Sequence, residues 1–308
     1  MQKRILEAPT LFYQKLPNWL FIILACIMVY LFVFLGSFVG GAMLSLPIMV
    51  LYLINPTGFS LTVAFSSLYF QLSLFFFVAL LVFAWVKWAE KRPISSLGLF
   101  RENWIKDIVK GWGVGMLVFS AAFLLTYLFG GVELRSVNFS TAAVLSVLST
   151  IPFWFIQGGT EELLTRGWLL PLINKRSNLA AAVGISSSLF GLMHLANSHV
   201  TVFSILSIIL SGVFMALYML KTDNLWGVAG LHGAWNFTQG NLYGVAVSGQ
   251  GAGTSLFHFA SKAGAADWIS GGAFGTEGSL LTSLVLLAAI VILTLLLKKE
   301  SNSIYKEA

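Results

Sequence analysis

The stretch WLFIILACIMVYLFVFLGSFVGGAMLSLPIMVLYLI, residues 19–54, decides the fold class because it contains no charged residue. A helix needs roughly 20 mostly apolar residues to cross a bilayer, so this run is longer than one straight span requires. Gly36, Gly40, Gly41 and Pro47 lie within it and give a helix places to bend. We therefore predict one long, bent transmembrane helix.

The composition of the whole chain agrees with this prediction. The 308 residues are 57% hydrophobic and 10% charged, whereas a soluble domain usually carries about 25% charged residues. A chain this apolar cannot cover itself with polar surface in water, which excludes a soluble enzyme. The single cysteine, Cys26, excludes an internal disulfide and a thiolate metal cluster.

Seven further apolar segments follow the first one. They are residues 61–86, 108–129, 142–174, 179–197, 202–220, 225–245 and 280–297. Together they predict an all-α fold, a polytopic membrane bundle of about eight transmembrane helices. We treat the chain as one integral membrane domain, residues 1–308, in which the glycine-rich residues 246–279 form a flexible extracytoplasmic loop.

The basic residues give the orientation. An even number of spans puts both termini on one side, and cytoplasmic loops are rich in Lys and Arg. With a cytoplasmic N-terminus, sixteen of the 18 Lys and Arg residues fall on the inner side, and only Arg135 and Lys262 fall outside. We therefore predict cytoplasmic termini in a multi-pass protein of a cell membrane, typical of a bacterial cytoplasmic membrane. This topology explains the net charge of +6, so nucleic-acid binding is not needed to account for it.

Three predicted spans carry polar side chains at membrane depth, where such groups are costly and usually functional. They are Glu161, Glu162 and Arg166 in the fourth span, His194 in the fifth, and His232 and Asn236 in the seventh. At a rise of about 1.5 Å per residue, Glu161, His194 and Asn236 lie roughly 18–25 Å from the inner ends of their helices. Their shared depth predicts a common cavity.

These groups permit hydrolysis of an amide bond. A carboxylate beside an imidazole can take a proton from water, and imidazole and amide N–H groups can stabilise an oxyanion. The sequence has no H-E-x-x-H motif, no pair of intramembrane aspartates and no Gly-x-Ser-Gly motif. A glutamate-centred site or a Glu/His metal site remains. Structural roles also stay open, since Glu162 and Arg166 can neutralise each other along one helix face.

Three motifs follow one another on these segments. They are Glu161-Glu162-Leu-Leu-Thr-Arg166 (E-E-x-x-x-R), Phe190-Gly-Leu-Met-His194 (F-x-x-x-H) and His232-Gly-Ala-Trp-Asn236 (H-x-x-x-N). In this order they resemble the CPBP family of intramembrane proteases. That family includes bacterial bacteriocin-processing and immunity proteins (the ABI group) and the type II CAAX prenyl endopeptidases. The resemblance covers residues 95–245, the expected catalytic core.

The resemblance implies an intramembrane endopeptidase acting on a hydrophobic peptide or a membrane protein. Glu161 would activate water with the help of His194. His232 and Asn236 would form the oxyanion site. The supporting residues would be Glu162, Arg166 and Phe190. We expect the substrate to reach the site from the inner side or laterally.

The resemblance leaves the question of a metal open. Older descriptions of the family treat these residues as zinc ligands, which here would be Glu161, His194 and His232. Because no pair among them has a familiar zinc-ligand spacing, we favour a mechanism with no metal and no cofactor, with a zinc metalloprotease as the alternative.

Two other classes compete with the protease. The first is a non-catalytic membrane immunity or scaffold protein that binds a peptide or a membrane-protein partner in the same cavity. The second is a secondary transporter, which commonly has paired halves, and we find no second copy of the Glu/His set before residue 95.

Overall fold

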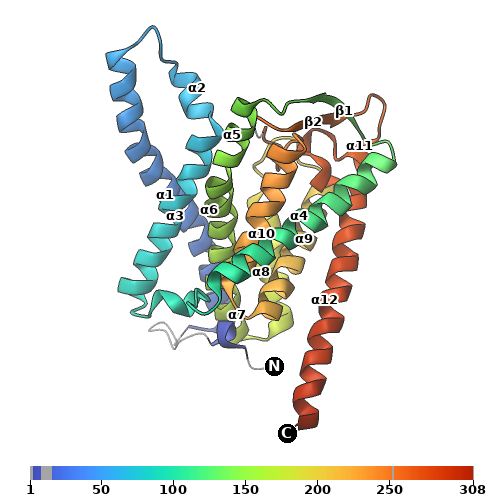
Figure 1. The fold of residues 1–308 in the computed structure, drawn as a ribbon. Helices are drawn as coiled ribbons and strands as arrows, with labels where there is room; N and C mark the ends of the chain where they lie inside the picture. The colour runs from blue at the N-terminus through green and yellow to red at the C-terminus, as the bar shows by residue number, and fades with distance from the viewer. Residues whose placement is uncertain (1–2, 8–15, 252, 308) are drawn as a thin grey trace.

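The computed structural model describes residues 3–7, 16–251 and 253–307. The predicted all-α membrane bundle is confirmed, because long apolar helices run side by side between two ends of the molecule (Figure 1). In lipid every backbone N–H and C=O must be paired within the protein, and a helix does this within a single segment.

Twelve α-helices are present in the described part of the chain. They are α1 (Asn18–Ile54), α2 (Leu61–Ser66), α3 (Leu68–Ala84), α4 (Trp104–Leu128), α5 (Thr141–Ser149), α6 (Ile151–Glu162), α7 (Leu170–Arg176), α8 (Leu179–Met193), α9 (Val202–Thr222), α10 (Leu225–Phe237), α11 (Asp267–Ser270) and α12 (Leu280–Glu307). Short 3-10 and π-helical turns connect several of them. They are η1 (Arg4–Leu6), η2 (Trp85–Ala89), η3 (Ile94–Leu97), η4 (Leu163–Leu169), η5 (Thr238–Leu242), η6 (Gly272–Phe274) and η7 (Thr276–Gly278).

Six helical segments of the described chain are long and apolar enough to cross a membrane. They are Asn18–Ile54, Leu68–Ala89, Trp104–Leu128, Thr141–Arg176, Val202–Thr222 and Leu280–Asn302. The spans predicted at residues 179–197 and 225–245 correspond to α8, with 15 residues, and to α10, with 13 residues that continue directly as η5, and neither is among these six segments. The count of eight therefore stays a prediction.

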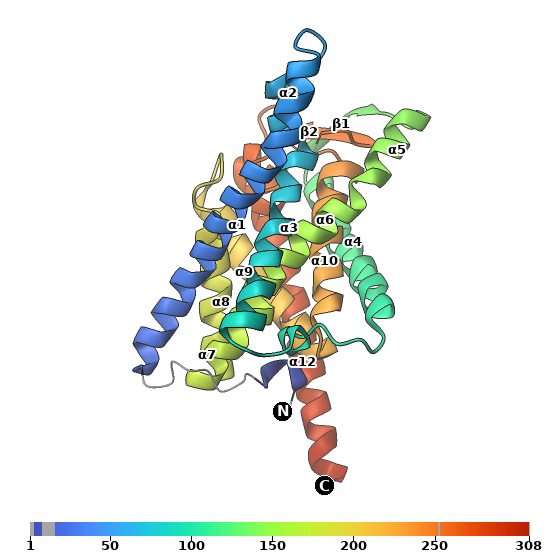
Figure 2. The same cartoon turned by 90° about the vertical axis from the view of Figure 1, so that its left-hand side faces the viewer.

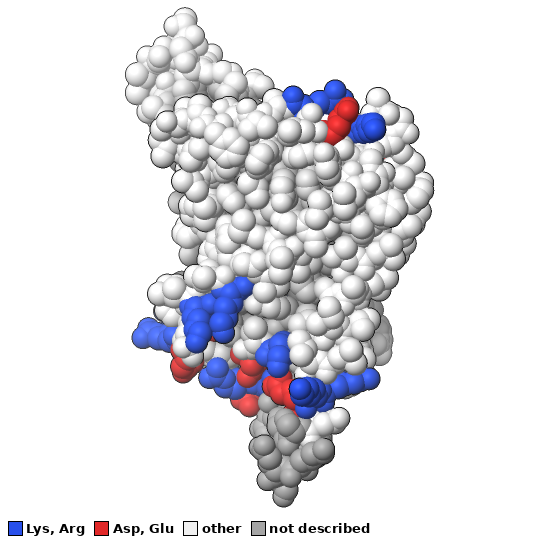
Figure 3. Space-filling view, turned by 45° about the vertical axis from the view of Figure 1, so that its right-hand side comes forward, with Lys and Arg blue, Asp and Glu red and all other residues white. Residues whose placement is uncertain are grey.

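The two ends of the bundle differ in charge. Both termini lie at one end (Figures 1 and 2), which we call the inner end, and most of the visible Lys and Arg side chains gather there (Figure 3). The opposite, outer end carries Arg135, which pairs with Glu133 at 2.7 Å. This distribution is the one that the predicted orientation requires.

The outer end also carries a small sheet. Strand β1 (Val132–Val137) pairs antiparallel with β2 (Phe257–Ser261), and a bulge lies between Leu134 and Ser136 (Figure 1). Residues 246–279, expected to be a flexible loop, therefore contain a strand, a short helix and two 3-10 turns. These elements fold over the outer end of the bundle.

Side-chain caps fix where three consecutive helices, α8, α9 and α10, begin. Asn178 and Asn224 accept hydrogen bonds from the backbone N–H groups of Ala181 and Gly227, each at 3.0 Å. Thr201 forms a reciprocal capping box with Ser204. Such caps satisfy backbone donors that the first helical turn leaves unpaired, so they set the starts of α8, α9 and α10.

Helix α10 is the centre of the bundle and packs against α4, α6 and α9. Glycines allow these close approaches, because Cβ atoms at Gly111 and Gly115 would collide with carbonyl oxygens of α10. Between α6 and α10, a Cβ at Gly158 would lie 2.7 Å from the backbone nitrogen of Gly233. This contact brings the E-E-x-x-x-R and H-x-x-x-N motifs together.

The inner end is closed by the N-terminal segment. The backbone N–H groups of Arg4 and Ile5 donate to the carboxylate of Asp223, both at 3.1 Å, and Ile5 is buried. Lys3 and Lys221 both pair with Glu300, at 2.6 and 2.8 Å. These contacts tie the N-terminus to the ends of α9 and α12.

Candidate active site

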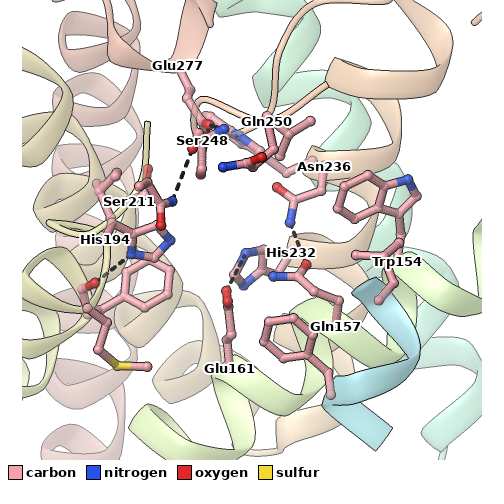
Figure 4. A pocket seen from close by; sticks show the side chains of 18 of the residues that line it. Trp154, Gln157, Glu161, His194, Ser211, His232, Asn236, Ser248, Gln250 and Glu277 are labelled. Carbon is pink, nitrogen blue, oxygen red and sulfur yellow. Dashed lines mark hydrogen bonds and ion pairs between the residues drawn. The ribbon is translucent and has the colours of Figure 1, made fainter. Parts of the chain in front are cut away.

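A cavity of about 310 Å³ lies among the motif-bearing helices. Figure 4 shows Glu161, His194, His232 and Asn236 around one common space, together with polar side chains from other elements. All four residues that the sequence assigned to catalysis therefore line the same cavity.

The remaining lining comes from several further parts of the fold. Apolar side chains are contributed by α1 and α3 (Val33, Leu68, Leu72, Phe75), α6 (Trp154), α8 (Phe190, Met193), α9 (Ile208, Met215), α10 (Trp235) and the loop after it (Val247). Polar side chains are those of Gln71, Gln157, Asn197, Ser211, Ser248, Gln250 and Glu277.

Both the E-E-x-x-x-R and the H-x-x-x-N helices run into π-helical turns. Helix α6 ends at Glu162 and continues as η4, and α10 ends at Phe237 and continues as η5. A π-helical turn contains an extra residue, which changes the direction of the side chains beyond it and is frequent at functional sites. These turns allow each motif to face the cavity while the helix continues through the bundle.

His232 connects the two neighbouring glutamates. Its Nδ1 atom lies 2.9 Å from Oε1 of Glu162, and its Nε2 atom lies 3.5 Å from Oε2 of Glu161. The side chain of Glu162 is fully buried, whereas that of Glu161 is 9% exposed and reaches the cavity. The two adjacent carboxylates therefore have different environments, one structural and one open to the cavity.

Glu162 and Arg166 form the predicted pair on one helix face. Nη1 of Arg166 donates to Oε1 of Glu162 at 2.9 Å and to Oγ1 of Thr165 at 2.6 Å. The Arg166 guanidinium also lies over the ring of Phe190, 4.6 Å from its centre. Arg166 thus neutralises the buried carboxylate that contacts His232.

His194 follows the last residue of α8, and its environment fixes which ring nitrogen carries the proton. Its Nδ1 atom lies 2.8 Å from the carbonyl oxygen of Phe190. A carbonyl oxygen only accepts hydrogen bonds, so Nδ1 is the donor and Nε2 of the neutral ring keeps its lone pair. Among the described residues, His194 makes no direct hydrogen bond to Glu161, whose imidazole neighbour is His232.

Asn236 is held by a residue outside the motifs. Its Nδ2 atom donates to Oε1 of Gln157 at 2.7 Å. An amide nitrogen carries two hydrogens, so a second donor stays available to the cavity. Gln157 lies four residues before Glu161 and belongs to none of the three motifs. A polar amide in an apolar span, one helical turn before a motif glutamate, is nevertheless a sequence signal that could have identified it.

Residues 142–238 match the family described as Type II CAAX prenyl endopeptidase Rce1-like. These residues are similar to that family, and we call them the Rce1-like segment. The match contains all three motifs and lies within the range of the resemblance, so the similarity to CPBP membrane proteases is confirmed. It supports a CAAX-type intramembrane endopeptidase in general, and it gives no support to the ABI group or to a metalloprotease. No curated protein and no solved structure matches the chain.

The Rce1-like segment does not form the cavity alone. Gln71 comes from α3, and Ser248, Gln250 and Glu277 come from the outer connection between α10 and α12. Glu277 accepts hydrogen bonds from the backbone N–H of Ser248 and from Nε1 of Trp235, so it anchors this connection over the cavity. No motif pointed to these residues because only the tertiary fold brings them here.

The three alternative zinc ligands, all within the Rce1-like segment, are not arranged to bind one metal ion together. In the described chain no three His, Cys, Asp or Glu side chains are placed to hold a metal ion together. Both nitrogens of His232 face carboxylate oxygens, and Nδ1 of His194 is bonded to a carbonyl. This arrangement does not fit the Glu161–His194–His232 ligand set, so we derive no step through a metal.

Proposed function

We propose that this protein is an intramembrane endopeptidase that hydrolyses a peptide bond in a hydrophobic or membrane-associated polypeptide. The proposal depends most on the environment of one atom, Oε2 of Glu161. This buried carboxylate oxygen has no hydrogen-bond donor among the described residues beyond the 3.5 Å contact with His232, and its side chain lines the cavity. A carboxylate in this position is able to accept a proton from water.

The first step is the attack of water on the substrate carbonyl carbon. Glu161 takes one proton of the water, and the lone pair on Nε2 of His194 accepts a hydrogen bond from the other. His194 is suited to this orienting role because its Nδ1 atom is engaged by Phe190. The attack forms a new C–O bond and moves the carbonyl electron pair onto oxygen.

The resulting oxyanion needs hydrogen-bond donors that stabilise its negative charge. Asn236 supplies its second N–H, since Gln157 engages only one. The two ring nitrogens of His232 face the carboxylates of Glu162 and Glu161, at 2.9 and 3.5 Å. We assign His232, which lines the same cavity, as the second donor for the oxyanion.

The last step breaks the amide bond. The protonated Glu161 carboxyl returns its proton to the leaving nitrogen as the tetrahedral intermediate collapses. The products are a carboxylic acid and an amine, and Glu161 is restored as a carboxylate. The proton that Glu161 takes from water thus passes to the leaving amine, and the side chains named here are sufficient for both steps.

The experiment compares the wild type with Glu161→Gln in detergent, using a panel of peptides that correspond to membrane segments with their flanks. Glu133→Gln, on the exposed strand β1, is the matched control. We expect cleavage by the wild type and the control and none by Glu161→Gln, with activity retained in the presence of a zinc chelator. Equal cleavage by both glutamate variants contradicts the proposal. Loss of activity with chelator and its recovery with zinc contradicts the metal-free step.

A further inference from the structure

We infer that the cavity opens to the outer end of the bundle and takes an internal, extended polypeptide segment presented from the extracytoplasmic side. This inference rests on the proposed function and specifies the side from which the substrate comes and the chemistry of the segment. It also replaces our expectation that substrate reaches the site from the inner side.

The first argument is that the cavity is closed below Glu161. Every residue from 161 to 173 is buried, as are all residues of α10 except Trp226. Leu97, Ile5 and Leu225 are each no more than 1% exposed at the inner end. A polypeptide has no path through this packed inner half.

The second argument is the position of the rim. Three lining residues are exposed and mark the mouth of the cavity: Gln71 in the first turn of α3, and Gln250 and Gly251 in the outer connection. Asn197 and Gln250 belong to connections at the outer end (Figure 1), where Glu277 holds Ser248 in place (Figure 4). The open side of the cavity is therefore the end far from the cluster of Lys and Arg in Figure 3.

The third argument is depth. Lys175 marks the inner end of α7, and Glu161 lies 14 residues before it. At about 1.5 Å per residue this separation is about 20 Å, beyond the midplane of a hydrocarbon core of about 30 Å. The reacting bond thus lies in the outer half of the membrane.

The charge of the lining limits which part of a polypeptide fits. The cavity is lined by Glu161 and Glu277 but by no Lys or Arg of the described chain, because Arg166 lies behind Glu162. A free C-terminal carboxylate close to the scissile bond would meet the like charges of Glu161 and Glu277 without a Lys or Arg side chain to offset them. The amides of Gln71 and Gln157 instead suit the uncharged backbone of an internal segment.

Cysteine accessibility tests the orientation without requiring a substrate. In a Cys26→Ser background, Gln250→Cys reports the cavity rim and Glu102→Cys, whose native side chain is 68% exposed near Arg4, reports the inner end. We expect a membrane-impermeant maleimide to label Gln250→Cys in intact cells and to label Glu102→Cys only after permeabilisation. The reverse pattern overturns the inference.

A peptide pair tests the chemistry of the segment. Two peptides share one cleavable sequence and differ in the C-terminal group three residues after the scissile bond, a carboxamide or a carboxylate. We expect the carboxamide to be cleaved on the order of tenfold faster, and preference for the carboxylate overturns the inference. Glu161→Gln separates the two proposals. If cleavage requires Glu161 but favours the carboxylate peptide, the further inference fails and the proposed protease function holds. Cleavage that survives this substitution refutes the protease mechanism, whatever the labelling shows.

Discussion

The contact between α6 and α10 makes the position of His232 depend on Gly158. A Cβ at residue 158 would lie 2.7 Å from the backbone nitrogen of Gly233 and 3.0 Å from Cγ of His232, whereas ordinary contacts begin at 3.4 Å. The differences, 3.4 − 2.7 and 3.4 − 3.0, mean that Gly158→Ala must displace the backbone by 0.7 Å and the imidazole by 0.4 Å. Both displacements move His232 away from its place beside Glu161.

Since a misplacement of about 1 Å costs about a hundredfold in rate, we expect Gly158→Ala to lower kcat tenfold to a hundredfold, to order of magnitude. The neighbouring Gly159→Ala is the matched control, because its Cβ would make an ordinary 3.4 Å contact with Ala229. Alanine is favoured over glycine in helices by about 1 kcal/mol, so loss of helix does not explain reduced activity.

The assay is steady-state peptide cleavage in detergent, together with the thermal unfolding temperature of each variant. We expect Gly159→Ala to retain activity within about threefold of the wild type, as its Cβ requires no displacement. Wild-type activity in Gly158→Ala refutes the reasoning, and so does equal loss in both variants.

Three further outcomes follow from the geometry. Asn236→Ala removes an oxyanion donor and should lower kcat about 10²–10³-fold with little change in KM, as initial-rate kinetics would reveal; an effect confined to KM contradicts that role. Arg166→Leu leaves the buried carboxylate of Glu162 without its guanidinium partner and should cost about 3–5 kcal/mol of unfolding free energy. Part of this loss should return in the double variant with Glu162→Gln, so additive losses in denaturant titrations would argue against the pair. Glu90→Ala removes the acceptor of the indole N–H of Trp168 at 2.9 Å; it should lower the melting temperature while sparing kcat below that temperature, and an unchanged melting temperature contradicts this.

The sequence predicted the membrane bundle and the meeting of the polar residues, because both depend on local patterns. Long apolar runs specify transmembrane helices, and depth along each helix follows from residue count. Glu161, His194 and Asn236 therefore reach one cavity, as expected. The predicted pairing of Glu162 with Arg166 also follows from helix periodicity.

The sequence did not predict the details of the site that depend on contacts between neighbouring elements. The apolar run at residues 225–245 did not show that α10 is buried inside the bundle. Periodicity did not indicate that His232, rather than His194, contacts Glu161. Glu277 and Gln250 come from a connection whose composition indicated a flexible loop, and only tertiary packing makes it part of the cavity.

The burial of α10 has a consequence for how the protein is made. All of its 13 residues except Trp226 are buried inside the bundle, and it carries His232 and Asn236. Its main neighbours, α4, α6 and α9, all precede it in the chain and so leave the ribosome first. Helix α10 therefore packs against helices that are synthesised before it. Because it brings the last two residues of the site, a nascent or incompletely inserted chain has no assembled catalytic cluster.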